Sequence, residues 1–204
     1  LGCRPYEGDY YNTGRETFIA PVEWNAEWPI VSPASKEIRY EYTANYKEVK
    51  QKNALPQSGN FQYTLTFQKQ LDPSLMFLRT RDSNSFSLSK LKGLSLKLKP
   101  ETCMDLGAPS FVGKRQQHLN CTVETVLDFS AVTKDEKAGM IVFQDEKHFY
   151  FLCKSIDNGK QVIQLFKSNT QTRTMDLVAQ QSLAESSGNL RLRIKAAGPY
   201  YDFY

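Results

Sequence analysis

The sequence predicts an all-β protein of the sandwich or barrel type, and three observations support this class. From Asn60 onward, short apolar runs alternate with turn residues, as in antiparallel sheets rather than in βαβ units. No stretch of ten or more residues carries the 3.6-residue apolar period of an amphipathic helix. Phe, Tyr and Trp make up 12% of the chain, which favours sheet because aromatic side chains pack well on a pleated surface.

Residues 1–55 differ in character from the rest of the chain. They contain both tryptophans, Trp24 and Trp28, and their apolar runs are interrupted by prolines. A polar stretch that begins near residue 34 is typical of a connector. We therefore predict a separate N-terminal segment with a linker over 1–55 and a β-sandwich domain over 56–204, with the boundary near Pro56.

Within the sandwich, the clearest strand is predicted over residues 119–129. Every second side chain from Leu119 to Phe129 is suited to a buried face, and the residues between them are mostly polar. This alternation predicts a core strand. The other strands are predicted over residues 61–67, 75–78, 86–88, 94–98, 138–144, 149–154, 161–167, 175–179, 190–194 and 200–204.

Asn158-Gly159 lies between two of these strands. Asn-Gly supplies the positive φ angles of a type I′ turn. We therefore predict a hairpin in which residues 149–156 pair with residues 161–166.

The composition argues against several classes of function. The net charge is only +4, and the lysines between Lys90 and Lys99 alternate with leucines, as on the solvated face of a strand, so we expect no nucleic-acid partner. No segment reaches the roughly 18 apolar residues of a membrane span, and no membrane partner is expected. The four cysteines are too far apart for a C-x-x-C motif, and no Gly-rich phosphate loop is present. The sequence predicts no metal and no cofactor.

Catalytic candidates are few. Glycoside hydrolysis needs two carboxylates, and Glu16 and the acidic doublets at 135–136 and 145–146 are available. Both doublets fall in predicted turns, where exposed charge is usual, so we expect them to be solvated.

Two stretches resemble a known enzyme family. The sequence GRETFIAPVEW from Gly14 to Trp24, followed by Trp28-Pro29, resembles the close of the five-bladed β-propeller in the β-xylosidase-like branch of glycoside hydrolase family 43. The sequence SFVGKRQQH from Ser110 to His118, followed by KAGM from Lys137 to Met140, resembles the concanavalin A-like β-sandwich, or jelly roll, that comes after that propeller. The resemblance covers nearly the whole chain.

This resemblance implies a role as an accessory domain. The family's three catalytic acids lie in the propeller, upstream of the GRET element, so the chain is expected to carry no catalytic residue and to be inactive alone. Its partner would be the catalytic propeller of a parent β-xylosidase or α-L-arabinofuranosidase, which would bring it xylo- or arabino-oligosaccharides. Arg15, the arginine of GRET, maps onto a substrate-binding position, and a salt bridge within the last propeller blade is the alternative.

The resemblance also assigns a structural role to Arg115, Gln117 and His118, which we expect to form a polar network at the entrance of the 119–129 strand or at a domain interface. The family usually has two successive arginines before this glutamine and histidine, and Lys114 stands here in place of the first. A lysine cannot donate the paired hydrogen bonds of a guanidinium. The family's sandwich continues beyond a segment like 197–204, so we expect the final strands to be missing and a sheet edge to be open, as in a piece of a longer protein. Two alternatives are an independent lectin-like carbohydrate-binding module and a structural module that forms homo-oligomers through the open edge.

Overall fold

The computed structural model describes residues 2–3, 13–39, 41–43, 59–184 and 188–204. The chain divides into two compact units, Leu1–Leu65 and Thr66–Tyr204. All regular elements in the described ranges are β-strands, as predicted for the fold class. The predicted boundary near Pro56 and most of the predicted linker lie outside the described residues.

The first unit contains two short strand pairs. Strand β1 (Gly2–Cys3) pairs with β2 (Arg15–Glu16), and β3 (Val22–Trp24) pairs with β4 (Pro29–Val31). The turn between β3 and β4 is closed by reciprocal backbone hydrogen bonds between Asn25 and Trp28. Most of the large apolar side chains that the structure describes in this unit are exposed, so the described pairs do not enclose a core of their own.

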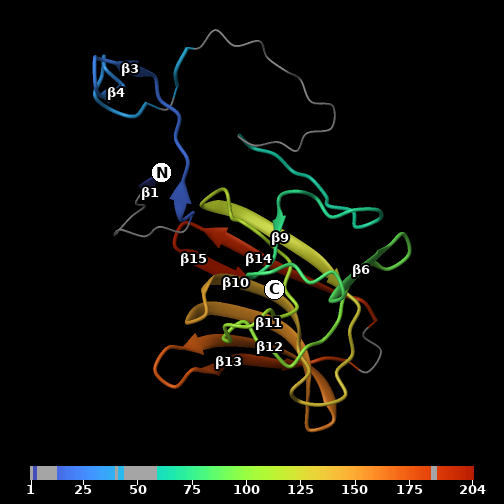
Figure 1. Cartoon of the computed structure of the whole chain (residues 1–204). Helices are drawn as coiled ribbons and strands as arrows, with labels where there is room; N and C mark the ends of the chain where they lie inside the picture. The colour runs from blue at the N-terminus through green and yellow to red at the C-terminus, as the bar shows by residue number, and fades with distance from the viewer. Residues whose placement is uncertain (1, 4–12, 40, 44–58, 185–187) are drawn as a thin grey trace. The chain divides into compact units, whose positions relative to one another are not determined.

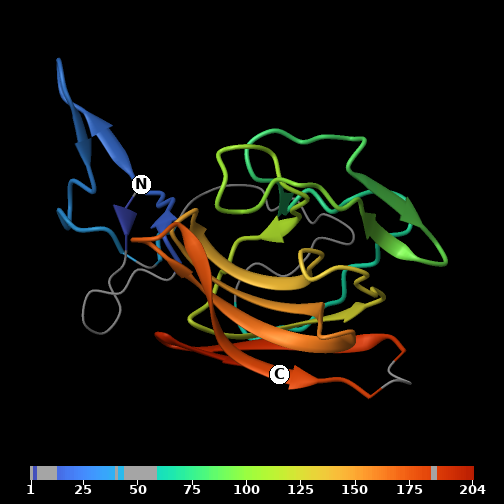
Figure 2. The same cartoon turned by 90° about the horizontal axis from the view of Figure 1, so that it is seen from below.

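The second unit is built from two antiparallel sheets, which Figure 2 shows as stacked layers. The larger sheet has the order β10-β11-β12-β13, and the smaller has the order β15-β14-β9 (Figure 1). Two further pairs, β5 with β8 and β6 with β7, come earlier in the chain. The bounds are β5 (Leu75–Met76), β6 (Phe86–Ser89), β7 (Gly93–Leu96), β8 (Gly113–Lys114), β9 (Asn120–Leu127), β10 (Ala138–Asp145), β11 (His148–Asp157), β12 (Lys160–Asn169), β13 (Thr174–Ser182), β14 (Leu190–Ala197) and β15 (Tyr200–Phe203).

The predicted hairpin is confirmed as the β11–β12 pair. Ile156 pairs with Gln161 and Phe151 with Phe166. Asn158 and Gly159 have φ angles of 48° and 75°, the left-handed values that a type I′ turn requires. The local turn chemistry therefore fixes the register of the two central strands of the large sheet.

The main core lies between the two sheets. Leu152 of β11 and Leu192 and Ile194 of β14 are buried. The ring centroids of Tyr150 and Phe203, one from each sheet, are 5.8 Å apart. Alternate residues of β11 and β14 thus supply this core, as a period of two requires.

The opposite face of the large sheet is also covered. Cys153 is fully buried there, and burial raises the pKa of its thiol to about 12. Phe111, from the segment before β9, lies 5.8 Å from Phe143 between ring centroids. The Ser155 hydroxyl donates to the carbonyl of Glu136 at 2.8 Å. Loops therefore form a second layer of packing over β10 and β11.

Two strand predictions need correction. Residues 61–67 are not a strand, although their burial alternates with a period of two. Strand β9 forms within the predicted range but is not a core strand, since none of its residues is buried and it lies at the end of its sheet. Its register places Val123 beside the buried Ile194, yet Val123 is 52% exposed because no described strand pairs with the outer edge of β9.

Gly139 marks a close approach between β10 and β11. A Cβ atom at this position would meet the carbonyl oxygen of Leu152 and would lie 2.6 Å from Cys153 Cα. We expect Gly139→Ala to lower the free energy of unfolding by more than about 2 kcal/mol, since backbone atoms cannot move aside as a flexible side chain can. Denaturant unfolding measures the loss.

Gly188→Ala is the matched control, because a Cβ atom there has no neighbour within 4 Å. An equal loss in both variants would contradict the close approach and would point to a general effect of replacing glycine.

Candidate functional site

Arg15 lies in the short strand β2, directly after Gly14, whose φ angle of 68° forms the turn. Its backbone pairs with Cys3, and its side chain is exposed. The neighbouring Glu16 accepts a hydrogen bond from the Thr13 hydroxyl at 2.8 Å. The GRET element is therefore a tight turn that presents a guanidinium to solvent.

A shallow apolar hollow of about 540 Å³ lies beside this strand. Its lining among the described residues consists of glycine and of aliphatic or aromatic side chains, among them Phe18, Val22 and Ile38. None of these described lining residues carries a charge or a hydroxyl group. Because a sugar needs directional hydrogen bonds, this hollow fits a protein side chain better than a saccharide.

The polar entrance, residues 114–118, connects β8 to β9. Arg115 and Gln117 are exposed here, whereas Gln116 and His118 are half-buried. Gln116 Nε2 donates to the His118 carbonyl oxygen at 2.8 Å, and the Tyr201 hydroxyl donates to Gln116 Oε1, also at 2.8 Å. These two hydrogen bonds join Gln116, His118 and Tyr201. The side chains of Arg115 and Gln117, which the sequence predicts in a polar network with His118, take part in neither bond.

Lys114 fixes the other end of the polar entrance. Its backbone pairs with Leu75, and its Nζ donates to the Ser74 hydroxyl at 2.7 Å. Ser74 in turn donates to Asp72 through its hydroxyl and its backbone N–H, which lowers the pKa of that carboxyl. A lysine therefore performs an anchoring role here that needs only one donor.

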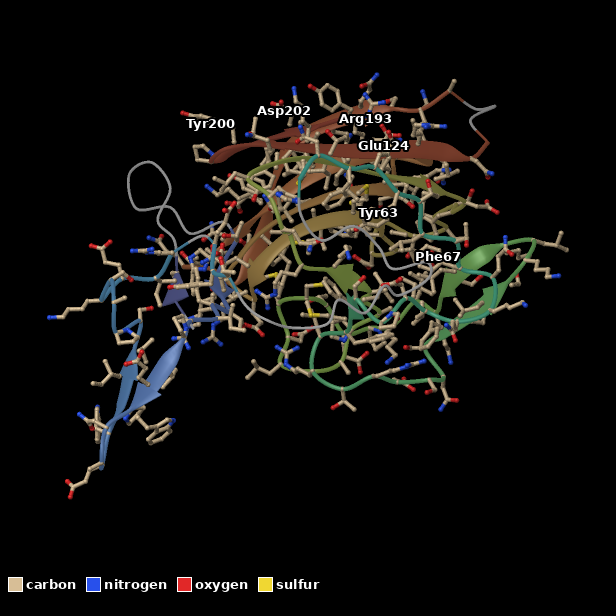
Figure 3. The ribbon with its side chains drawn as sticks, turned by 90° about the horizontal axis from the view of Figure 1, so that it is seen from above. Tyr63, Phe67, Glu124, Arg193, Tyr200 and Asp202 are labelled. Atoms are coloured by element: carbon tan, nitrogen blue, oxygen red, sulfur yellow. The ribbon has the colours of Figure 1, made fainter. Side chains whose placement is uncertain are left out.

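The outer face of the small sheet carries a fixed ion-pair cluster. Glu124 of β9 accepts hydrogen bonds from Arg191 Nη1 at 3.1 Å and Arg193 Nε at 2.5 Å, both on β14. Partial desolvation opposes ionisation of Glu124, but the two arginines outweigh it and the pKa lies below its ordinary value. Figure 3 shows Glu124 and Arg193 on this sheet together with Tyr200 and Asp202 of β15.

The acidic doublets have structural partners. Glu136 accepts from the backbone N–H of Val132 at 2.7 Å, and Glu146 pairs with Arg79. Asp145 Oδ1 lies 2.8 Å from Nδ1 of His148. Glu136, Asp145 and Glu146 therefore have contacts that close turns or join loops.

The described parts of the chain also bear on metal binding and membrane insertion. These residues include no group of three or more His, Cys, Asp or Glu side chains that could hold a metal ion. They also include no helix that is long and apolar enough to cross a bilayer.

Together these features define a two-sheet antiparallel β-sandwich with loops packed over one of its sheets. Residues 65–204 match the family described as the beta xylosidase C-terminal concanavalin A-like domain, and the chain belongs to that family. The family assignment confirms the predicted resemblance and the predicted concanavalin A-like fold.

Similar proteins are members of glycoside hydrolase family 43. The chain is 30% identical over 207 residues to a non-reducing end alpha-L-arabinofuranosidase of Bacteroides ovatus, covering 100% of this chain and 37% of that protein. It is 29% identical over 209 residues to a xylosidase/arabinosidase of Butyrivibrio fibrisolvens, covering 100% of this chain and 38% of that protein. The chain therefore spans well under half the length of these relatives.

Solved structures agree with the fold. The Bacteroides ovatus Xyloglucan PUL GH43B structure matches with a TM-score of 0.80 at 29% identity, covering 100% of this chain and 39% of that one. A GH43_12 protein retrieved from a capybara gut metagenome matches with a TM-score of 0.79 at 25% identity, with the same coverage of each chain.

The Tyr201–Gln116 bond can be tested by removing one hydroxyl. We expect Tyr201→Phe to lower the free energy of unfolding by about 1 kcal/mol, because Gln116 Oε1 loses its donor in a half-buried setting. Tyr200→Phe is the control, since the Tyr200 side chain is exposed. Equal melting temperatures for the two variants would show that the bond contributes nothing to stability.

Stability should also fall in acid. The Lys99 ammonium lowers the pKa of Asp82 from its ordinary 3.8, and the Thr102 backbone N–H does the same for Asp105. Because the folded pKa values are depressed, this stabilisation is complete above the ordinary pKa and is lost as pH falls through the folded values. We expect the melting temperature to be flat near pH 6 and to decline below about pH 4.

Asp82→Asn provides the check on this pH dependence. The variant should melt earlier than the unmodified chain near neutral pH, and the difference should shrink in acid, where Asp82 is protonated in the unmodified chain. A difference that stays constant with pH would contradict an electrostatic origin.

Proposed function

We propose that the chain acts as an accessory module that completes and stabilises the catalytic propeller of a glycoside hydrolase acting on xylosides or arabinosides of plant-wall hemicellulose. The observation that carries the proposal is the exposed apolar surface of the first unit, in a chain whose residues 65–204 belong to an accessory-domain family of β-xylosidases. The printed activities of the similar proteins, xylosidase and arabinofuranosidase, supply the substrate class.

The apolar surface is too large for a self-sufficient unit. Ile19, Trp24 and Trp28 are each more than 70% exposed. A two-stranded hairpin such as β3–β4 is marginal in water unless another layer covers it. Burial of each such side chain contributes roughly 1.5 to 3 kcal/mol, so a covering domain would be bound tightly through this face. A last propeller blade and its linker would have these properties.

Catalysis would then come from the covering domain. Glu136 contacts a loop backbone N–H, Glu146 pairs with Arg79, and Glu124 pairs with two arginines, so each of these carboxylates already has a partner within the chain. Arg15 is the residue of this chain that we propose contacts substrate, because its exposed guanidinium follows the Gly14 turn in the GRET element. A guanidinium fork suits paired sugar hydroxyls.

The proposal predicts an inactive chain that confers activity or stability on a partner. The chain should release no aglycone from an aryl β-xyloside or an aryl α-L-arabinofuranoside. Addition of a separately produced propeller domain encoded upstream in the same gene should give turnover, and that propeller should melt at a higher temperature with the chain than without it. Arg15→Ala should lower the turnover of the mixture without lowering its melting temperature.

Two results would contradict the proposal. Turnover by the chain alone would place catalysis within it. Calorimetric binding of neutral xylo-oligosaccharides by the chain, with no effect on the propeller, would favour a lectin-like module instead.

A further inference from the structure

The β6–β7 hairpin concentrates positive charge in a segment without acidic residues. Residues 83–100 contain four lysines and no Asp or Glu. In Figures 1 and 2 the hairpin projects from the rest of the second unit. The register pairs Phe86 with Leu96 and Ser89 with Gly93, so the turn falls at residues 90–92. This places a Lys-Leu-Lys sequence at the tip.

The base of the hairpin is held firmly. The Lys97 backbone N–H donates to the Ser85 carbonyl oxygen at 2.8 Å. The guanidinium of Arg81 lies 5.1 Å from the ring centroid of Phe86 and 5.5 Å from that of Phe77. The Lys99 ammonium donates to Asp82 at 2.9 Å. The tip is therefore presented by a fixed support, which limits the conformational entropy lost on binding.

The tip itself is open to solvent. Leu91 is 98% exposed, and Lys90 and Lys92 on either side of it are exposed as well. Within the described ranges neither lysine takes part in an ion pair, and Asp82, which precedes the hairpin in the sequence, is paired with Lys99. The two ammonium groups at the tip are thus available to an external anion.

We propose that this hairpin binds the uronic acid side groups of an acidic hemicellulose, with Lys90 and Lys92 pairing with sugar carboxylates and Leu91 packing on the C–H face of a sugar ring. The choice of polysaccharide rests on the proposed function, which places the parent enzyme on plant-wall xylosides or arabinosides. The hairpin would hold the enzyme on its polymer while the propeller performs the hydrolysis.

Other anions fit the tip less well. A nucleic acid would be expected to meet stacking aromatic side chains between the basic ones, and residues 89–98 contain none. Anchoring to an anionic bilayer normally needs two strong signals, and one leucine with two lysines falls short of a lipid chain with a polybasic cluster. An acidic polysaccharide carries single carboxylates spaced along its chain, and each can be bound by one or two ammonium groups, which the tip provides.

The test compares one polysaccharide in two chemical forms. The 204-residue chain is titrated with glucuronoxylan and with the same glucuronoxylan after its carboxyl groups have been reduced to alcohols. We expect binding to the acidic form only, weakening as salt rises because exposed ion pairs are screened. Lys90→Gln with Lys92→Gln should weaken this binding roughly three- to thirtyfold, from the usual strength of exposed ion pairs.

The control variant removes the same charge elsewhere. Lys160→Gln with Lys195→Gln changes two exposed lysines, one at the start of β12 and one on β14, and should leave the affinity unchanged. Both double variants should melt with the unmodified chain, since the side-chain amines at 90 and 92 are exposed.

Three outcomes would overturn the inference. Equal affinity for the carboxyl-reduced polysaccharide would show that the carboxylates are not recognised. An equal loss of affinity in the Lys160/Lys195 variant would show that the effect comes from net charge and not from the hairpin tip. Binding to vesicles of phosphatidylglycerol and phosphatidylcholine in place of glucuronoxylan, lost in the Lys90/Lys92 variant, would identify a lipid contact. In each case the complementation of the propeller would be unaffected, so the proposed function would stand or fall separately.

Discussion

The second unit depends on one constraint, the burial of β11 on both faces. One face carries the buried Leu152 and meets the small sheet where Tyr150 lies near Phe203, and loops close the other face over Cys153. A strand buried on both sides must satisfy its backbone within the sheet, and its partners β10 and β12 do this. Gly139 of β10 adds a close backbone approach within the sheet, because a Cβ atom there would meet the backbone of Leu152 and Cys153.

Most strands of the sandwich could be predicted from the sequence, because a period of two and an Asn-Gly turn are local signals. The Asn158-Gly159 turn defines the β11–β12 register without reference to the rest of the chain. The status of β9 could not be predicted, since the same alternation describes a central strand and an edge strand. The same kind of signal predicts a strand over residues 61–67. Their side chains do alternate in burial, but their backbone does not form a strand.

The polar entrance shows why side-chain networks are harder to predict than strands. The motif identified the segment, but residues 115–118 are not in a strand, so the phase of alternation cannot be extended back from Leu119. The Tyr201–Gln116 bond spans 85 residues of sequence, and no local pattern signals it. Its one hint was that Gln116 lies within a block of polar residues at a strand end.

The sheet topology also has a consequence for the order of folding. The β11–β12 hairpin joins neighbouring residues through a two-residue turn, and such hairpins form in roughly 1 to 10 μs. The β9–β14 pair joins residues as far apart as Asn120 and Ala197. Pairs of high sequence separation bear a larger loop-closure entropy and form late. A nascent chain would therefore form the four-stranded sheet before β9 pairs with β14. In that interval the apolar face of the four-stranded sheet that later packs on the small sheet is exposed, and exposed apolar faces bind chaperones and promote aggregation.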